Sequence, residues 1–339
     1  MHGVAKSAFS GLCRGGQGGR LSILVYHRVL AEPDPMLPTV PTESEFRWQM
    51  ELVGRYFNVL PLSEAVDRLY GGALPRRALC VSFDDGYADN CEVALPVAEA
   101  LGVPLAFFIA SGYLDGGRMW NDTIIELFRG IDEPRAVLQR LGMEVDPTTT
   151  GDRQRRASAE AVIEQLKHAS PEQREERTAW LASRAETALP DDLMMTAEQV
   201  RVLAGRGMDI GAHTVTHPIL ALLDTPSARR EIASSKARLE EITGRPIELF
   251  AYPNGKAGRD FSDRDADLLG ELGFKAAVTT EPGVSSSATP RYGLRRFTPW
   301  DRTPARFALR LAMNYGTSSE RMRAFDLSGA RARSELRSW

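Results

Sequence analysis

Cysteine is scarce in this chain. Only three occur in 339 residues, Cys13, Cys80 and Cys91, an odd number without a Cys-x-x-Cys spacing. This pattern argues against a disulfide framework and against a zinc site made of thiolates. Cys80 lies within an apolar run, so we expect it to act as a small apolar residue.

Long apolar runs and an excess of charge of one sign are also missing. No run approaches the length of a membrane span, and residues 1–20, rich in Gly, Ser and Arg, lack the apolar core of a signal peptide. The chain has 42 Lys and Arg residues against 45 Asp and Glu residues, so it lacks the excess of positive charge that is typical of nucleic-acid-binding proteins. We therefore expect a cytoplasmic protein without a transmembrane segment or a nucleic-acid partner. The sequence does not tell which protein partners, if any, the chain has.

Two adjacent carboxylates, Asp84 and Asp85, precede Gly86 at the end of the apolar run 78–83. The length and β-rich composition of the run predict a buried strand of a parallel sheet, and ligands bind where such strands end. Because neighbours on an extended backbone point to opposite sides, we expect the two carboxylates to divide the roles of base and metal ligand. A simple turn is the alternative, since Asp and Gly favour turns.

Histidine is also rare, yet His213 and His217, two of the five in the chain, share one loop after the predicted strand 208–212. Two imidazoles and one carboxylate would form a three-ligand set with an open position, which is typical of catalytic zinc rather than structural zinc.

Three motifs, in this order, resemble those of the polysaccharide deacetylase (NodB-homology) family. They are Ser82-Phe83-Asp84-Asp85-Gly86, His213-Thr214-Val215-Thr216-His217 and Phe250-Ala251-Tyr252-Pro253-Asn254-Gly255. The resemblance implies an α/β fold, a distorted (β/α) barrel of about seven strands in place of the regular eight. It also implies a metal-dependent hydrolase that removes acetyl groups from N-acetylated sugars. The alternation of predicted strands and helices independently favours a parallel barrel over a sandwich.

The resemblance assigns roles to individual residues. A divalent metal, zinc in the first place and another transition metal otherwise, would be held by Asp85, His213 and His217. Asp84 would act as the general base. The backbone amide of Asn254 would stabilise the oxyanion; the preceding Tyr252-Pro253 turn would hold it and border the substrate.

The general acid departs from the common family pattern, because no histidine follows His217. The early segment Val25-Tyr26-His27-Arg28-Val29 resembles the Tyr-His motif of a branch that acts on poly-N-acetylglucosamine-type exopolysaccharides. We therefore expect His27 to be the acid, since histidine ordinarily titrates near pH 6.5. Alternatively, His27 bonds a loop carbonyl.

A second departure concerns the third motif, where Ala251 stands in place of a common family arginine that orients the base. Arg295 or Arg296 on the last predicted strand is expected to pair with Asp84 instead. Trp120 and Tyr26 are candidates for a wall against a sugar ring, with core packing as the alternative. Asn121 and Asp122, which follow Trp120, are expected to cap a helix.

The predicted organisation is a flexible leader over residues 1–20, a barrel over 21–315 and a tail over 316–339. Residues 131–192 are dense in Arg, Glu, Gln and Ala without a strand-like run, so we expect a helical insertion there. His168, within it, is expected to be solvated.

The leading functional hypothesis is N-deacetylation of an exopolysaccharide or of another glycan precursor. A related amide or imide hydrolase with a non-sugar substrate is one alternative, because motifs report the reacting bond better than the attached group. A catalytically silent carbohydrate-binding barrel is another.

Overall fold

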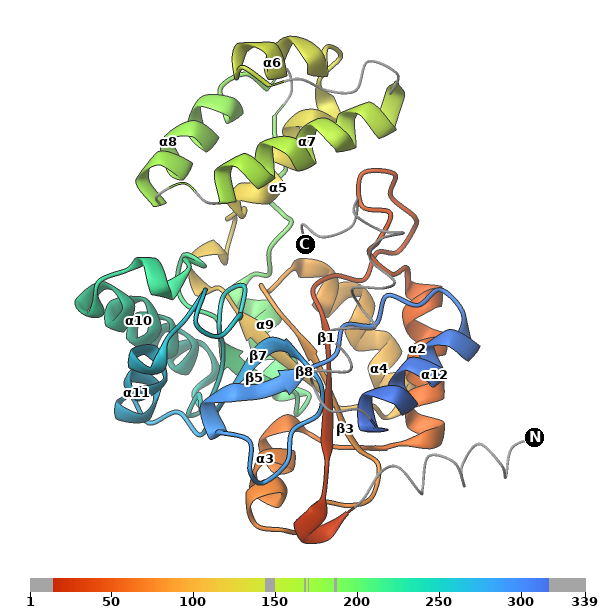
Figure 1. Cartoon of the computed structure of the whole chain (residues 1–339). Helices are drawn as coiled ribbons and strands as arrows, with labels where there is room; N and C mark the ends of the chain where they lie inside the picture. Colours follow the sequence, from red (N-terminus) through yellow and green to blue (C-terminus); the bar gives the residue numbers. More distant parts are fainter. Residues whose placement is uncertain (1–14, 144–149, 168, 170, 186–187, 317–339) are drawn as a thin grey trace.

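The structure, a computed structural model, describes residues 15–143, 150–167, 169, 171–185 and 188–316. Its sheet has eight strands, seven of them parallel neighbours in the order β1-β3-β4-β5-β6-β7-β8 (Figure 1). These seven are β1 Leu21–Tyr26, β3 Ala78–Phe83, β4 Leu105–Ile109, β5 Asp209–Ala212, β6 Leu249–Ala251, β7 Ala276–Pro282 and β8 Leu294–Arg296. The short β2, Asn58–Val59, pairs with the beginning of β3.

The two ends of this strand order meet, which nearly closes the barrel. The Val25 N–H donates to the Phe297 carbonyl (3.1 Å), and the Phe297 N–H donates to the Ile23 carbonyl (2.8 Å). The predicted distorted (β/α) barrel of about seven strands is therefore confirmed.

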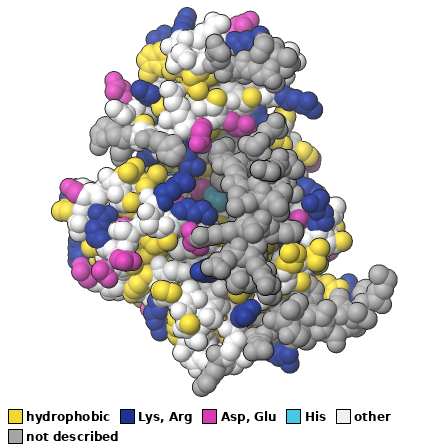
Figure 2. All heavy atoms as spheres, viewed as in Figure 1, with side chains coloured by type: hydrophobic (Ala, Val, Ile, Leu, Met, Phe, Trp, Pro, Cys, Tyr) yellow, Lys and Arg dark blue, Asp and Glu magenta, His cyan; other side chains and the backbone are white. Residues whose placement is uncertain are grey.

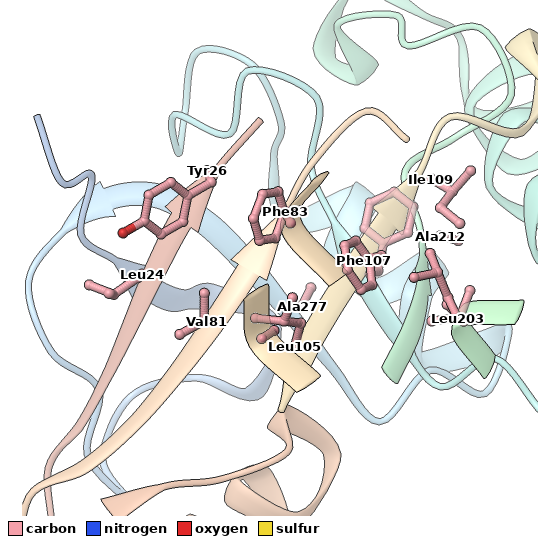
Figure 3. Packing of buried hydrophobic residues seen from close by; sticks show 14 of the residues in the cluster. Leu24, Tyr26, Val81, Phe83, Leu105, Phe107, Ile109, Leu203, Ala212 and Ala277 are labelled. Atoms are coloured by element: carbon pink, nitrogen blue, oxygen red, sulfur yellow. The ribbon is translucent and has the colours of Figure 1, made fainter. Parts of the chain in front are cut away.

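Helices surround the barrel and bury the outward-facing residues of its strands. They are α2 Glu43–Tyr56, α3 Leu62–Tyr70, α4 Leu95–Leu101, α9 Ala197–Gly205, α10 Thr225–Thr243, α11 Asp263–Glu271 and α12 Pro304–Gly316. Leu24, Val81 and Leu105 lie in register on β1, β3 and β4 and belong to the large cluster in Figure 3. The alternate strand positions form a second cluster with α3, so the strands are buried on both faces, as parallel strands require.

A helical lobe lies beyond the carboxyl ends of the strands (Figure 1). It consists of α5 Trp120–Gly130, α6 Pro134–Arg140, α7 Gly151–Lys167 and α8 Pro171–Ala182, which share a core separate from that of the barrel. Met36 and Leu37, from the loop after β1, join this core. Arg129 of α5 donates to both carboxylate oxygens of Asp34 in the same loop (2.9 and 2.8 Å). These contacts fix the lobe over the mouth of the barrel.

The sequence predicts a capping box at Thr196 and Gln199, a helix with Thr225 as its cap and proline at its first position, and a helix capped by Asn121 or Asp122. Only the first of these predictions is confirmed. The capping box of Thr196 and Gln199 at α9 is present. At α10 the cap is Asp224, whose carboxylate accepts from the Ser227 N–H (2.7 Å), so Thr225 lies inside the helix. Neither Asn121 nor Asp122 caps α5, which begins after Met119 without a side-chain cap.

The leader before Gly15, His168 and the tail after Gly316 lie outside the described residues, and the division into domains stays a prediction. Within the described ranges, no helix combines the length and the apolar character needed to cross a bilayer.

Candidate metal centre and active site

Three potential metal ligands converge at the carboxyl ends of β3 and β5. The Asp85 Oδ1 lies 3.4 Å from His213 Nε2 and 3.5 Å from His217 Nε2, and the two ring nitrogens lie 3.1 Å apart. All three side chains are mostly buried, and Asp85 Oδ1 has no hydrogen-bond partner among the described residues. A buried carboxylate oxygen without a donor indicates a cation site.

The donor set fits a divalent metal. Tetrahedral ligands at 2.0–2.1 Å from zinc lie about 3.3–3.4 Å from one another, close to the three observed separations. His213 Nδ1 lies 2.7 Å from the Ala251 carbonyl, which can only accept, so Nδ1 carries the proton and Nε2 faces the site with its lone pair. His213, His217 and Asp85 would hold the ion and leave a position open.

Local charges also suit a cation. Burial raises the pKa of Asp85, but the adjacent His213, together with His217 and His27, outweighs burial and holds this pKa well below its ordinary value. Burial, with help from the charge of His213, lowers the pKa of His217 to about 4. The His217 ring is therefore neutral near pH 7, as metal binding requires.

The backbone at these residues adopts an unusual conformation. Asp85, Thr214, His217 and Asn254 have φ between 55° and 76°, the left-handed region that L residues rarely adopt. Such strain persists only where surrounding contacts enforce it, and it clusters at functional sites. For the His213–His217 loop, these contacts include Glu231 of α10, whose carboxylate accepts from the Val215 and Thr216 N–H groups (2.8 and 2.9 Å).

Asp84 points into the barrel, where Arg296 from β8 meets it. The two guanidinium nitrogens Nη1 and Nη2 donate to the two carboxylate oxygens, each at 2.6 Å, and both residues are only 2% exposed. Burial alone would raise the pKa of Asp84, but Arg296 and His213 outweigh burial and lower it. Asp84 is therefore ionised near neutral pH and fixed in orientation.

His27 follows β1 at the same face of the barrel. Its side chain is exposed and, within the described part of the chain, makes no hydrogen bond. The Asn90 side-chain amide donates to the His27 carbonyl (2.8 Å), and the Asp89 carboxylate accepts from the Val29 N–H (3.3 Å). These bonds fix the backbone on both sides of the ring, and the charge of His27 reaches Asp84 and Asp85.

Comparison with known proteins relates this chain to polysaccharide deacetylases. The polysaccharide deacetylase family model matches residues 152–277, which contain both histidines and Asn254 but not Asp84 or Asp85. The putative polysaccharide deacetylase YxkH of Bacillus subtilis is 21% identical over 278 residues, 82% of this chain and 70% of its own length. Residues 152–277 of this chain thus match the polysaccharide deacetylase family, and the chain is similar to a putative member of it.

Two solved structures share the fold of this chain. The deacetylase PplD of Streptococcus pyogenes, in complex with acetate, has a TM-score of 0.59 at 17% identity, with 88% of this chain and 99% of that chain covered. IcaB from Ammonifex degensii has a TM-score of 0.55 at 20% identity, with 89% and 99% covered. The match to the polysaccharide deacetylase model and the similarity to YxkH support a hydrolase of the N-deacetylase class.

Of the two arginines predicted to replace the family arginine, the structure brings only Arg296 to Asp84. Successive strand residues face opposite sides, so Arg295 points out of the barrel, where its guanidinium approaches the Pro282 carbonyl (3.5 Å). The prediction that Arg295 serves the site is wrong for this reason. Ala251 contributes through its backbone carbonyl, which orients His213.

Three of the four predicted substrate contacts are buried. Tyr26 is 4% exposed and donates to Gln49 Oε1 (2.7 Å), and Tyr252 stacks on Phe261 with ring centroids 3.7 Å apart. Pro253 is buried as well. Packing covers both rings, so Tyr26 follows the alternative of core packing and does not form a wall against a sugar ring, and the Tyr252 ring does not border the substrate. Trp120, at the start of α5, remains partly exposed.

A buried polar network beside the metal site escaped prediction. Arg28 Nε donates to Asp89 Oδ2 (2.7 Å), and its guanidinium lies 4.6 Å from the Tyr87 ring centroid. The Tyr87 hydroxyl donates to Asp122 Oδ1 (3.3 Å), whereas Asp122 Oδ2 has no partner among the described residues. The only sequence signal was proximity, since Arg28 follows His27 and Tyr87 follows Gly86.

Proposed function

We propose that this protein is a metal-dependent hydrolase that removes N-acetyl groups from a carbohydrate, either an exopolysaccharide or another glycan precursor. One observation carries the proposal: the unpartnered Asp85 Oδ1 faces two imidazole nitrogens at 3.4 and 3.5 Å, beside an ionised Asp84 held by Arg296. Zinc is the preferred ion, and the cytoplasm remains the proposed compartment.

A divalent cation bound by Asp85, His213 and His217 would polarise the acetyl carbonyl and acidify a water molecule. Asp84 directly precedes the metal ligand Asp85 in the chain and accepts the proton of the attacking water. Although Arg296 engages both of its oxygens, each oxygen has a second lone pair available. The lowered pKa of Asp84 keeps the carboxylate ionised and so able to accept this proton.

Asn254 is proposed to stabilise the oxyanion through its backbone N–H. Within the described residues this N–H has no acceptor, and the Thr280 hydroxyl fixes the same peptide segment by donating to the Asn254 carbonyl (2.5 Å). A fixed donor directed at developing charge needs no reorganisation during the reaction.

His27 is proposed to protonate the departing amine. Its exposed ring can reach substrate, and the bonds from Asn90 and to Asp89 limit where the ring can lie. A histidine suits proton donation near neutral pH.

The test combines metal analysis of the purified protein with acetate release from N-acetylated oligosaccharides, with and without chelator. The proposal requires acetate release that chelator abolishes and added Zn²⁺ or another divalent transition metal restores. Asp85→Asn is the matched control, because it removes the charged ligand at nearly constant shape. Acetate release that neither chelator nor this substitution affects contradicts the proposal.

A further inference from the structure

A buried arginine in the helical lobe lacks a counterion. Arg174 of α8 is 9% exposed, and within the described residues its guanidinium has neither a salt bridge nor a hydrogen bond. Burial lowers the pKa of Arg174, as expected for a cation without an adjacent acid. One turn further along α8, the buried Thr178 hydroxyl likewise has no described partner. The Arg174 guanidinium and the Thr178 hydroxyl therefore lie on the same face of this helix, both without a described partner.

The position of Arg174 near the start of α8 makes its positive charge even less favourable. Arg174 lies in the first turn of α8, which begins at Pro171, and the free N–H groups of a helix start carry positive partial charge. The guanidinium lies 5.2 Å from the centroid of the Trp120 ring, but such an attraction is weaker than the cost of burying an unpaired cation. An anion at the guanidinium would supply the missing counterion.

Arg174 is also linked to the candidate active site. Tyr113, on the segment after β4, is within electrostatic reach of both Arg174 and Asp85. Its hydroxyl donates to the Thr216 carbonyl (3.0 Å), within the loop that carries His213 and His217. Figure 1 shows that α8 begins at the end of the lobe nearer the barrel, and Figure 2 shows basic side chains beside a histidine at the surface below the lobe.

We propose that Arg174, with Trp120 beside it, binds an anionic group, phosphate or carboxylate, on the carbohydrate that is deacetylated at the metal centre. The inference rests on the proposed function and narrows its substrate to an acidic or phosphorylated glycan. The planar guanidinium can grip either anion with two parallel hydrogen bonds, and the indole offers an apolar face to the sugar ring.

The test measures binding by calorimetry on metal-loaded protein. The probes are N-acetylglucosamine 1-phosphate, a hyaluronan tetrasaccharide that carries carboxylates, and neutral chitotetraose. Wild type is expected to bind one acidic probe at least about tenfold more tightly than the neutral probe, the range for a charge-assisted hydrogen bond. The acidic probe that is preferred identifies the anion.

Arg174→Gln is expected to lose this preference. Arg177→Gln is the matched control, since Arg177 is an exposed arginine on the same helix, and it should retain the preference. Anions can also bind the metal, but all variants share the same ligands, so the difference between variants reports on Arg174. Absence of a preference in wild type, or its persistence in Arg174→Gln, overturns the proposal.

Stability separates binding from packing. Removal of an unpaired buried charge should leave the melting temperature of Arg174→Gln equal to or above that of wild type, whereas an arginine with a packing role would lower it. If Arg174→Gln folds poorly, Arg174→Lys, which keeps the charge, must retain part of the preference; complete loss overturns the proposal. Acetate release is measured in parallel, so an absence of hydrolysis with intact anion preference contradicts the proposed function and not this inference.

Discussion

Asp84 and Arg296 form a buried ion pair in the candidate site. If Asp84 is the general base, catalysis requires its negative charge, whereas a purely structural role does not. Asp84→Asn keeps the shape of the side chain but cannot take up a proton at neutral pH. We expect turnover to fall by at least about 10²-fold while metal content is unchanged, because general-base catalysis typically contributes this much. Acetate release and metal stoichiometry on the same preparation check this prediction, and unchanged turnover removes Asp84 from the mechanism.

His27 is exposed and lacks a described hydrogen-bond partner, which suits an acid that meets substrate. His27→Ala should slow substrates with poor amine leaving groups far more than activated acetate esters, because only the amine must be protonated as it departs. Rates on an N-acetylated oligosaccharide and on an activated aryl acetate provide the comparison. Equal slowing of both substrates counts against the assignment.

Asp122 gives a prediction about stability. Burial, with the charges of Asp85 and Glu126, raises its pKa to about 7, although Arg28 and the Tyr87 hydroxyl oppose the rise. The folded protein thus holds this proton to higher pH than the unfolded chain, so the carboxyl costs folding stability increasingly as pH rises from about 4 towards 7.

Asp122→Asn removes this ionisation. We expect the gain in melting temperature over wild type to be larger at pH 8 than at pH 5, by more than about 2 °C. Thermal melts at the two pH values test the prediction. A gain that does not depend on pH would show that the Asp122 carboxyl does not titrate in this way.

At the scale of the element, strand β5 places the two histidines and depends on a glycine. A Cβ at Gly211 would lie 2.5 Å from Phe108 Cδ1 on β4 and 3.0 Å from the Leu249 carbonyl on β6. Gly211→Ala should therefore push β5 away from its neighbours, lowering both the free energy of unfolding and the metal affinity.

Gly205→Ala is the control for this substitution. Gly205 is the last residue of α9, and no atom would contact its Cβ within 4 Å, so alanine should be neutral or stabilise the helix by up to about 1 kcal/mol. Chemical denaturation and metal titration of both variants test the comparison. Equal effects at the two positions would mean that the contact at Gly211 is relieved without cost.

The helical lobe is a second element whose placement matters. The hydrophobic core of the lobe contains no residue of the barrel strands, but it does contain Met36 and Leu37 from the loop after β1. The strand β1 leads directly into His27. The lobe therefore connects Trp120 and Arg174 to the same strand ends that carry the metal ligands. A lobe in this position can contact parts of a glycan away from the reacting N-acetyl group.

At the scale of the whole molecule, the metal site joins two distant parts of the chain, since Asp85 follows β3 whereas the histidines follow β5. A cation that binds only the folded state stabilises it by mass action. We expect Zn²⁺ at 100 times its dissociation constant to stabilise the chelator-treated protein by about 2.7 kcal/mol, with no such effect in Asp85→Asn. Melting temperatures of both proteins, measured as a function of Zn²⁺ concentration, test this prediction. Equal stabilisation of wild type and Asp85→Asn would contradict it.

Much of the fold and part of the site followed from local pattern. The strand at residues 78–83 was predicted with its observed bounds, because a short apolar run ending in Asp and Gly is distinctive. The carboxyl ends of parallel strands share one edge, so the sequence alone brought Asp85 to the same face as His213 and His217. The capping box at α9 was also predictable, because it involves only residues three positions apart in the sequence.

Tertiary structure alone decided the contacts between residues far apart in sequence. It brought Arg296 and not Arg295 to Asp84, 212 positions away, because the register of β8 sets which arginine faces inward. It buried Tyr26 and Tyr252, and it placed Asp122 and Arg174 where no local signal pointed. Sequence determines which side chains follow each strand, but their burial and their partners depend on packing between distant segments.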